Sequence, residues 1–107
     1  MSVINEKISQ EKFLEFLGTA PFFKIAVDLE REKISAGCEL HSDCAEELIA
    51  DGSQYKNVWG ANIYRDRSLD FISLINIRPP RNRSMNIGDE NIVVAMKKIA
   101  EKYFGNG

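Results

Sequence analysis

Apolar and polar side chains alternate along residues 22–30 and again along residues 33–41. Successive side chains of a β-strand point to opposite faces of the sheet, so this period of two predicts two half-buried strands. Residues 58–65 and 70–79 predict a second hairpin around the intervening sequence DRSL. The stretch 71–77 is apolar on both faces, which is typical of a central strand that is covered on both sides.

Three helices are predicted by apolar stripes with a period of 3.6 residues and by capping residues at their ends. They are expected at residues 9–18, 43–52 and 90–104. Ser9 is the expected N-cap of the first helix. Asp43 is the expected N-cap of the second, because a glutamate follows it at the spacing of a capping box.

The resulting order of elements, α-β-β-α-β-β-α, predicts an α+β fold. It favours one mainly antiparallel, four-stranded sheet with the helices packed on one face. The 107 residues suit a single domain, residues 1–107, with one hydrophobic core. Hydrophobic residues make up 44% and charged residues 28% of the chain, a balance that excludes a disordered protein.

The first two strands have one register that pairs apolar with apolar side chains. A turn at residues 31–32 places Ile25 opposite Cys38 and Val27 opposite Ala36. Slipping either strand by one residue would place apolar opposite polar side chains throughout, so the register is well specified. Cys38 is therefore expected on the core face of the hairpin.

Overall charge and hydropathy exclude several classes of partner. The net charge of −2 disfavours a protein that binds nucleic acid by broad electrostatic attraction. No apolar run reaches the roughly 20 residues of a membrane span, so no membrane partner is expected. The sequence begins without a basic region followed by an apolar stretch, so no secretory signal is expected and a cytoplasmic location is predicted.

The two cysteines are expected to be reduced thiols, because a chain without a secretory signal is predicted to stay in a reducing compartment. Cys44 is expected in the first turn of the second helix, where the helix dipole lowers the pKa of a thiol. A reactive thiol is one interpretation of Cys44. A small buried side chain is the interpretation that the sequence favours.

The segment GCELHSDC, residues 37–44, holds the only histidine and both cysteines. In an extended segment, Glu39, His41 and Asp43 share one face and could act as nitrogen and oxygen ligands of a divalent ion. Asp43 is expected to cap a helix instead, and Cys38 is expected on the opposite face. We therefore expect no metal centre and no cofactor, and we take His41 with Glu39 as a candidate acid–base pair.

A second polar cluster follows the last predicted strand, in the sequence NIRPPRNRSMN. Arginine forks suit carboxylate or phosphate groups, and asparagine and serine add neutral hydrogen bonds. Together with the histidine segment, this cluster predicts a site for a small anionic or zwitterionic ligand. The candidate ligand-binding residues are Glu39, His41, Trp59, Asn62, Asn76, Arg78, Asn82, Arg83 and Ser84.

The motifs GCELHSD, GS, WGANIY, SLINIRP and NRSM occur in this order. This order resembles an uncharacterised family of short prokaryotic proteins, a domain of unknown function, over nearly the whole chain. The resemblance implies no activity. The family pattern more often has glycine at position 38 and alanine at position 44, which argues against thiol chemistry as a family property. The resemblance implies that Glu39, His41, Trp59, Asn62, Asn76, Arg78, Asn82 and Ser84 belong to the pattern.

Three functions from different classes remain open. The first is a binding domain for a small anionic or zwitterionic ligand. The second is a small enzyme that acts on an anionic substrate with His41 as acid or base. The third is a protein-interaction domain without a pocket, such as a homodimer. A concave polar cleft that joins His41 to Arg78 would favour the first two, and a flat apolar patch would favour the third.

Overall fold

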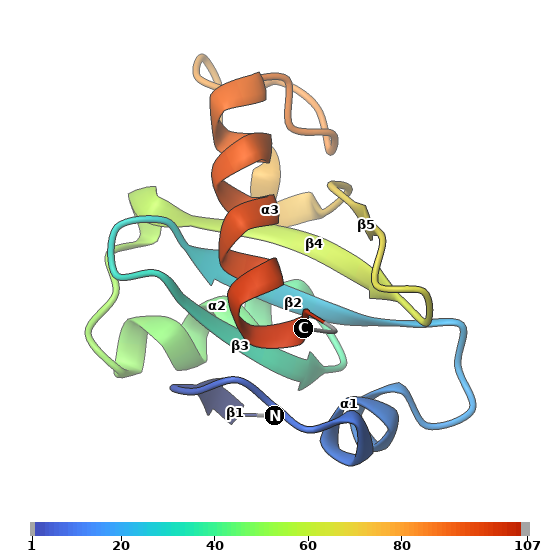
Figure 1. Ribbon diagram of the computed structural model, residues 1–107. Coiled ribbons are helices and arrows are strands. Elements are labelled where there is room, and N and C mark those ends of the chain that lie inside the picture. Colours follow the sequence, from blue (N-terminus) through green and yellow to red (C-terminus); the bar gives the residue numbers. More distant parts are fainter. Residues whose placement is uncertain (1, 106–107) are drawn as a thin grey trace.

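The strands form a five-stranded antiparallel sheet in the order β1-β3-β2-β4-β5 (Figure 1). The computed structural model describes residues 2–105. The strands are β1 (Ser2–Ile4), β2 (Phe22–Asp28), β3 (Lys33–Cys38), β4 (Val58–Tyr64) and β5 (Leu69–Asp70). The helices are α1 (Gln10–Leu17), α2 (His41–Ala50) and α3 (Glu90–Phe104), with short 3-10 turns at η1 (Tyr55–Asn57) and η2 (Leu74–Asn76).

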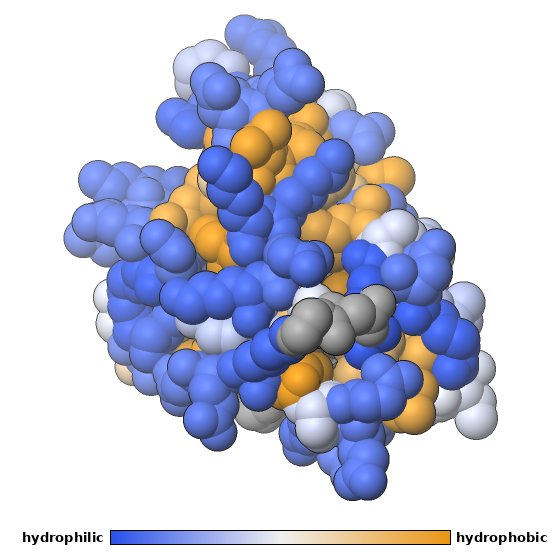
Figure 2. Space-filling model, in the orientation of Figure 1, coloured by the Kyte–Doolittle hydropathy of each residue, from blue (hydrophilic) through white to orange (hydrophobic). Residues whose placement is uncertain are grey.

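Helices cover both faces of the sheet. In Figure 1, α3 crosses in front of the strands and α2 lies behind them. The larger core lies on the α3 face and includes Phe13 of α1, Ile25 of β2 and Met96 of α3. The smaller core lies on the α2 face and includes Ala26 of β2 and Leu48 of α2. On the α3 side, hydrophilic side chains cover most of the outer surface and apolar groups show beside the helix (Figure 2).

The predicted α+β class and the antiparallel sheet are confirmed, but the predicted four strands and the one-sided helices are wrong. The additional strand, β1, pairs with β3. It is too short to show a clear alternation in the sequence. Helices occupy both faces because small residues lie on the α2 face of the central strands, where Ala26 is paired with Gly60. A second layer can therefore pack closely there.

The first hairpin has the predicted core face but not the predicted register. Ile25 lies opposite Ala36 rather than Cys38, so the predicted Ile25–Cys38 pair is wrong. The turn is longer than expected because Asp28 Oδ1 accepts hydrogen bonds from the backbone N–H groups two and three residues ahead, at 2.9 and 3.1 Å. This side-chain turn removes the next residue from the ladder and shifts the pairing by two positions.

The end of β3 departs from regular alternation. The ladder shifts between Lys24 and Ile25, where Lys24 lies opposite Cys38, and Gly37 adopts a φ of 78°. A positive φ is costly for residues other than glycine, so Gly37 permits this bulge. The bulge turns Cys38 away from the α3 core, and Cys38 packs against the smaller core on the α2 face.

The predicted helices are confirmed for α1 and α3, and the start of α2 needs a correction. Ser9 caps α1 as predicted and accepts a hydrogen bond from the backbone N–H of Lys12 at 3.1 Å. Helix α2 begins at His41, two residues before the predicted start, so Asp43 lies inside its first turn. The Asp43 carboxylate accepts a hydrogen bond from the backbone N–H of Leu40 at 3.3 Å, so Asp43 caps the helix without being the N-cap.

The predicted central strand at residues 71–77 is wrong. Strand β5 ends at Asp70 on the edge of the sheet, and the chain then turns into η2. The backbone of β4 at Gly60 therefore lies beyond the end of β5, and the side chain of Asn76 takes the place of a strand. The Gly60 N–H donates to Asn76 Oδ1 at 2.8 Å, and Asn76 Nδ2 donates to the Gly60 carbonyl at 3.0 Å.

Gly60 is required where the segment around η2 (Leu74–Asn76) crosses the sheet. A Cβ atom at Gly60 would lie 2.7 Å from both Cβ and Oγ of Ser73. That separation is far shorter than van der Waals contact, so any other residue would push the segment away. The close approach places the segment around η2 over the α2 face of β4, where Ile75 joins the smaller core.

We expect Asn76→Asp to lower the free energy of unfolding by about 3 kcal/mol. The aspartate keeps an acceptor for Gly60 but loses the amide that donates to the carbonyls of Gly60, Phe71 and Met85. Urea unfolding followed by circular dichroism measures this change. Asn91→Asp on the exposed start of α3 is the matched control and should stay within about 0.5 kcal/mol of wild type. An Asn76→Asp protein as stable as that control would contradict the strand-like role of Asn76.

Candidate functional site

A hollow of about 350 Å³ lies at the N-terminal end of α2. Its walls come from the ends of β2 and β4, from the corner between β3 and α2, and from the segment around η2. We call it the His41 pocket. It is lined by Phe22, Lys24, Leu40, His41, Ser42, Asn62, Ile72, Ser73, Leu74, Ile75 and Met85.

The imidazole of His41 is held in one orientation. Its Nε2 atom lies 3.0 Å from the carbonyl oxygen of Ala61 and 2.9 Å from Asn62 Oδ1. Both partners accept hydrogen bonds, so the hydrogen of the neutral ring is on Nε2. The amide of Asn62 is oriented in turn, because its Nδ2 donates to Asp70 Oδ1 at 2.9 Å. The Ala61 carbonyl and the Asn62 oxygen that Asp70 orients therefore both favour the Nε2–H tautomer of His41.

The environment keeps His41 neutral near pH 7. Burial lowers the pKa of His41 below its ordinary value of 6.5, and the positive charge of Lys24 acts in the same direction. The hydrogen bonds to Ala61 and Asn62 and the charge of Asp70 oppose this change but do not reverse it. A neutral ring with its hydrogen on Nε2 leaves the Nδ1 lone pair available as an acceptor or a base.

The hydrogen-bond chain continues away from the pocket. The hydroxyl of Tyr64 donates to Asp70 Oδ2 at 2.7 Å, and this hydrogen bond raises the pKa of Tyr64. Both oxygens of the Asp70 carboxylate are thus used, one by Asn62 and one by Tyr64. Asp70 was not among the predicted site residues. A turn centred on DRSL places Asp70 opposite Arg65, whereas the structure pairs Asp70 with Asn62, so the predicted register did not bring Asp70 to the site.

The rim of the pocket is apolar and exposed. Leu74 exposes 72% of its surface and Leu40 exposes 59%, unusually large fractions for leucine. Ile72 and Met85 are also exposed. Among the described residues that line the pocket, Lys24 alone is charged, and its Nζ lies 5.9 Å from the ring centre of Phe22. The pocket therefore combines apolar walls with one ammonium group and one oriented imidazole.

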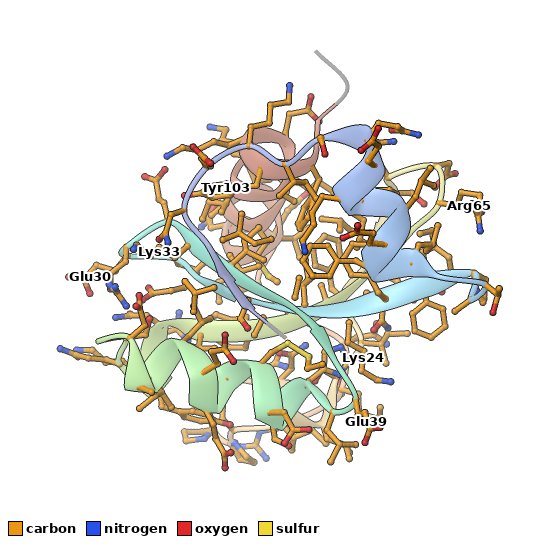
Figure 3. The ribbon with its side chains drawn as sticks, turned by 90° about the horizontal axis from the view of Figure 1, so that it is seen from below. Lys24, Glu30, Lys33, Glu39, Arg65 and Tyr103 are labelled. Carbon is orange, nitrogen blue, oxygen red and sulfur yellow. A yellow bond between two sulfur atoms is a disulfide. The ribbon has the colours of Figure 1, made fainter. Side chains whose placement is uncertain are left out.

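Glu39 lies near this pocket but outside its lining. It is exposed and lines a neighbouring hollow together with Lys24 and Cys38. Figure 3 shows Lys24 and Glu39 at the same end of the sheet, on the side of α2, and Tyr103 on the opposite side. Among residues 2–105, no hydrogen bond joins Glu39 to His41.

Arg78 is bound to the backbone of its own protein. Its guanidinium donates to the carbonyl oxygens of Val58 at 2.6 Å, Ile75 at 2.7 Å and Tyr55 at 3.1 Å. It also stacks 4.1 Å above the ring of buried Trp59. Burial lowers the pKa of Arg78, although an arginine stays charged in proteins. Arg78 therefore closes the edge of β4 rather than facing the His41 pocket.

Asn82 organises the loop that follows Arg78. Its Nδ2 donates to the carbonyls of Asn76, Ser84 and Asn86, each at 2.9 Å, and its Oδ1 accepts from the Gly88 N–H at 3.0 Å. The Ser84 hydroxyl donates to the Asn86 carbonyl. Asn82 and Ser84 thus shape the loop that carries Met85 to the pocket.

The structure therefore brings some of the predicted site residues to the pocket and places others elsewhere. His41 and Asn62 line the pocket. Asn76 ties the wall around η2 to Gly60 of β4, Arg78 stacks on Trp59 at the edge of β4, and Arg83 is exposed. His41 binds the carbonyl of Ala61 and Arg78 that of Val58. Three residues along a strand span roughly 10 Å, so the two side chains contact separate parts of β4.

The prediction of two reduced thiols is wrong, because Cys38 and Cys44 form a disulfide. The bulge at Gly37 and the early start of α2 bring the two residues together on the α2 face. Among the described residues, no three His, Cys, Asp or Glu side chains lie together so as to hold a metal ion. None of the helices in that part of the chain has the length and apolar character needed to cross a bilayer.

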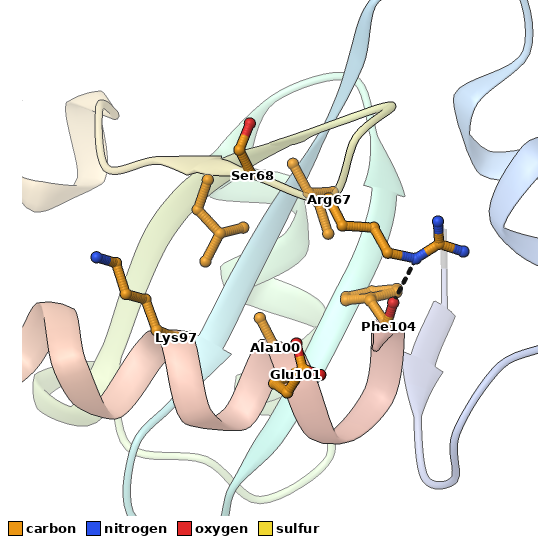
Figure 4. Close-up of a pocket in the computed structure, with 8 residues that line it drawn as sticks. Arg67, Ser68, Lys97, Ala100, Glu101 and Phe104 are labelled. Atoms are coloured by element: carbon orange, nitrogen blue, oxygen red, sulfur yellow. Dashed lines mark hydrogen bonds between the residues drawn. The ribbon is translucent and has the colours of Figure 1, made fainter. Parts of the chain in front are cut away.

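A second hollow, of about 360 Å³, lies between α3 and the turn from β4 to β5 (Figure 4). Arg67 lies at its edge, but its guanidinium donates to the Phe104 carbonyl at 2.6 Å and to Gln10 Oε1 at 2.6 Å. It also stacks on the ring of Phe13 at 4.1 Å. These contacts fasten α1 and α3 to the turn, so Arg67 has a structural role. The His41 pocket is the better candidate site because its polar groups are oriented and still available.

Residues 2–103 match the family DUF5674, described as a protein of unknown function. The match spans nearly the whole chain, so the chain belongs to this family, and the predicted resemblance to an uncharacterised family is confirmed to that extent. No curated protein and no solved structure gives a significant match. Membership of the family brings no activity with it, so a function has to be inferred from the geometry of the site.

We expect the pKa of His41, measured by NMR titration, to lie below 6.5. The unfolded chain then binds the proton more tightly than the folded chain, so the stability that the neutral ring provides is complete above pH 6.5 and is lost as the pH falls below it. Unfolding by urea at about pH 7.5 and about pH 5 measures the loss, and His41→Gln should remove it. The lowered pKa values of Asp51 and Asp66 start from 3.8 and act at lower pH. A His41 pKa above 6.5 would contradict the buried, neutral ring.

Proposed function

We propose that this member of DUF5674 binds a small carboxylate with an apolar body in the His41 pocket. The observation that carries the proposal is the composition of the lining, which has apolar walls, one ammonium group on Lys24 and the oriented imidazole of His41. Sites for small molecules are mostly apolar hollows with a few placed polar groups, and their volumes run from about 300 to 1,000 Å³. The His41 pocket lies at the small end of that range.

The charge of the lining supports an anionic ligand. Among the described residues that line the pocket, none is acidic, and Lys24 contributes a positive charge. A carboxylate near Lys24 would gain an ion pair that apolar walls shield partly from water. The apolar part of the ligand would cover Leu74, Leu40 and Ile72, which are exposed in the free protein. This interpretation narrows the predicted anionic or zwitterionic ligand to one with a substantial apolar body.

A second candidate function, catalysis on the same ligand, has one observation in its favour. His41 is neutral near pH 7 and its tautomer is fixed, which suits a general base acting through Nδ1. Glu39 makes no contact that would orient the ring, and Asp70 does so through Asn62. A catalytic role would therefore use His41 as the base, with Asp70 and Asn62 as positioning residues.

Phenylacetate is a suitable probe because it joins a carboxylate to a compact aromatic ring. We expect it to bind and to shift the ring signals of His41 in NMR spectra. Lys24→Gln should weaken phenylacetate binding about fivefold and leave binding of the uncharged phenylacetamide unchanged. Lys97→Gln, in the second hollow, is the matched control and should bind like wild type. If Lys24→Gln lowered the affinity for phenylacetate and for phenylacetamide by the same factor, the result would contradict a carboxylate beside Lys24.

Leu74→Ala tests the apolar wall. The substitution removes exposed side-chain surface that the ligand would cover, so we expect affinity for phenylacetate and phenylacetamide to fall about tenfold. Leu14→Ala removes the same atoms from exposed surface on α1 and should leave both affinities unchanged. Calorimetric titration measures both proteins. If phenylacetate and phenylacetamide fail to bind wild type at millimolar concentration, the proposed function is refuted for this class of ligand.

A further inference from the structure

The disulfide between Cys38 and Cys44 closes a ring around the corner between β3 and α2. Their Cα atoms lie 5.7 Å apart, with a sequence separation of 6. Three of the enclosed residues, Leu40, His41 and Ser42, line the His41 pocket. The disulfide therefore fixes the short stretch of backbone that presents the imidazole and one apolar wall to the pocket.

The two cysteines differ in their access to solvent. Cys44 is fully buried, with 0% of its surface exposed, whereas Cys38 is only partly buried. Cys38 also lines a hollow of about 410 Å³ between α1, the start of β2 and the end of β3, next to Lys24 and Glu39. Figure 3 shows the disulfide between α2 and β3, at the end of the sheet that carries these two side chains. A small reagent in solution can therefore approach Cys38 but not Cys44.

We propose that this disulfide is a thiol-exchange site for low-molecular-weight thiols such as glutathione, and that its redox state controls the His41 pocket. The exchange site stands on the geometry of the cysteine pair alone. Only its effect on ligand affinity rests on the proposed function.

The exchange begins when the thiolate of the small molecule attacks the Cys38 sulfur. A bond forms between these two sulfur atoms, the bond from Cys38 to Cys44 breaks, and its electron pair leaves with the Cys44 sulfur. Cys44 lies in the first turn of α2, where the positive end of the helix dipole favours the departing thiolate. This thiolate then takes a proton from solvent, and the protein carries a mixed disulfide on Cys38.

A second small thiolate completes the reduction. It attacks the small-molecule sulfur of the mixed disulfide, and the electron pair of the broken bond leaves with the Cys38 sulfur, which is then protonated. The protein gains two electrons and two protons in total, and two molecules of the small thiol become one disulfide. Cys44 takes no adduct in either step because it is buried.

Reduction removes the covalent tie between the end of β3 and the first turn of α2. Gly37 precedes this corner with a φ of 78°, and glycine has the largest conformational freedom of any residue. Without the disulfide, the corner still keeps the Asp43 cap on Leu40, the backbone hydrogen bonds from Asp43 and Cys44 to the Leu40 carbonyl, and the hydrogen bonds of His41 Nε2. We therefore expect the reduced corner to move and the His41 ring to lose its single orientation.

Peptide mapping of the full chain tests the exchange. The folded protein is incubated with reduced glutathione, quenched with acid and analysed by mass spectrometry. We expect a mixed disulfide on Cys38 and a free thiol on Cys44. An adduct on Cys44 would overturn the proposed order of attack. A disulfide that stays intact at glutathione concentrations that reduce the urea-unfolded chain would overturn the exchange site itself.

The single histidine of the chain reports on the corner. NMR correlation of the ring nitrogens of His41 is compared for the oxidised and the reduced wild-type protein. We expect the nitrogen shifts to change on reduction, from those of a fixed Nε2–H tautomer to those of a mixture. Identical His41 shifts in the two forms would overturn control of the pocket, whether or not any ligand binds.

Phenylacetate links the disulfide to the proposed function. We expect the affinity of the protein for phenylacetate to fall roughly fivefold or more when the disulfide of wild type is reduced. Because coupling is reciprocal, saturating phenylacetate should lower the equilibrium constant for reduction by glutathione by the same factor. The double variant C38A/C44A should bind phenylacetate with the affinity of the reduced protein, and glutathione should not change that affinity. If the variant does not fold, reduced wild type provides the comparison. Equal affinity of both forms overturns the control. Binding to neither form overturns the proposed function, while the adduct map and the His41 shifts still decide the exchange site.

Discussion

The amide of Asn76 pairs with both backbone groups of Gly60, and this interaction determines how the chain crosses the sheet. Strand β5 ends after two residues, so β4 would otherwise present unpaired backbone groups in the interior, at a cost of a few kcal/mol. Arg78 closes the same edge further along by binding the Val58 carbonyl. Because the side chains of Asn76 and Arg78 form hydrogen bonds with the backbone groups of this edge, the segment around η2 can leave the plane of the sheet and cover the α2 face.

The His41 pocket is a consequence of that crossing. One wall is the segment around η2, which is tied to β4 through buried polar groups. Ile75 of this segment is buried, and Leu74 is left exposed on the outside. The other wall is the corner at Leu40 and His41, which the disulfide ties to the end of β3. Each wall is fixed independently of the other. The space between them can therefore stay open without an internal contact to fill it.

Local patterns in the sequence were sufficient for the N-cap of α1 and for the core face of the first hairpin up to Ala36, because those features depend on neighbouring residues. Ser9 and the alternation around Ile25 are examples. The sequence does not reveal that the side chain of Asn76 pairs with β4 in place of a strand. The apolar residues on both sides of Asn76 give residues 71–77 the pattern of a central strand. The disulfide depends on a bulge at Gly37, which reverses the face of Cys38. Such contacts between distant segments leave no periodic signal.

A carboxylate ligand with an apolar body would change the pKa of His41 in two opposite ways. The charge of Lys24 lowers the pKa of His41 in the free protein, and burial is the larger cause. A carboxylate beside Lys24 would offset that charge and raise the pKa of His41, whereas the apolar body of the same ligand would exclude water from the ring and lower it. The two effects partly cancel, so His41 stays neutral in the complex if desolvation remains the larger one. A neutral ring would then offer the ligand a hydrogen-bond acceptor at Nδ1, which favours a ligand that has a donor group beside its carboxylate.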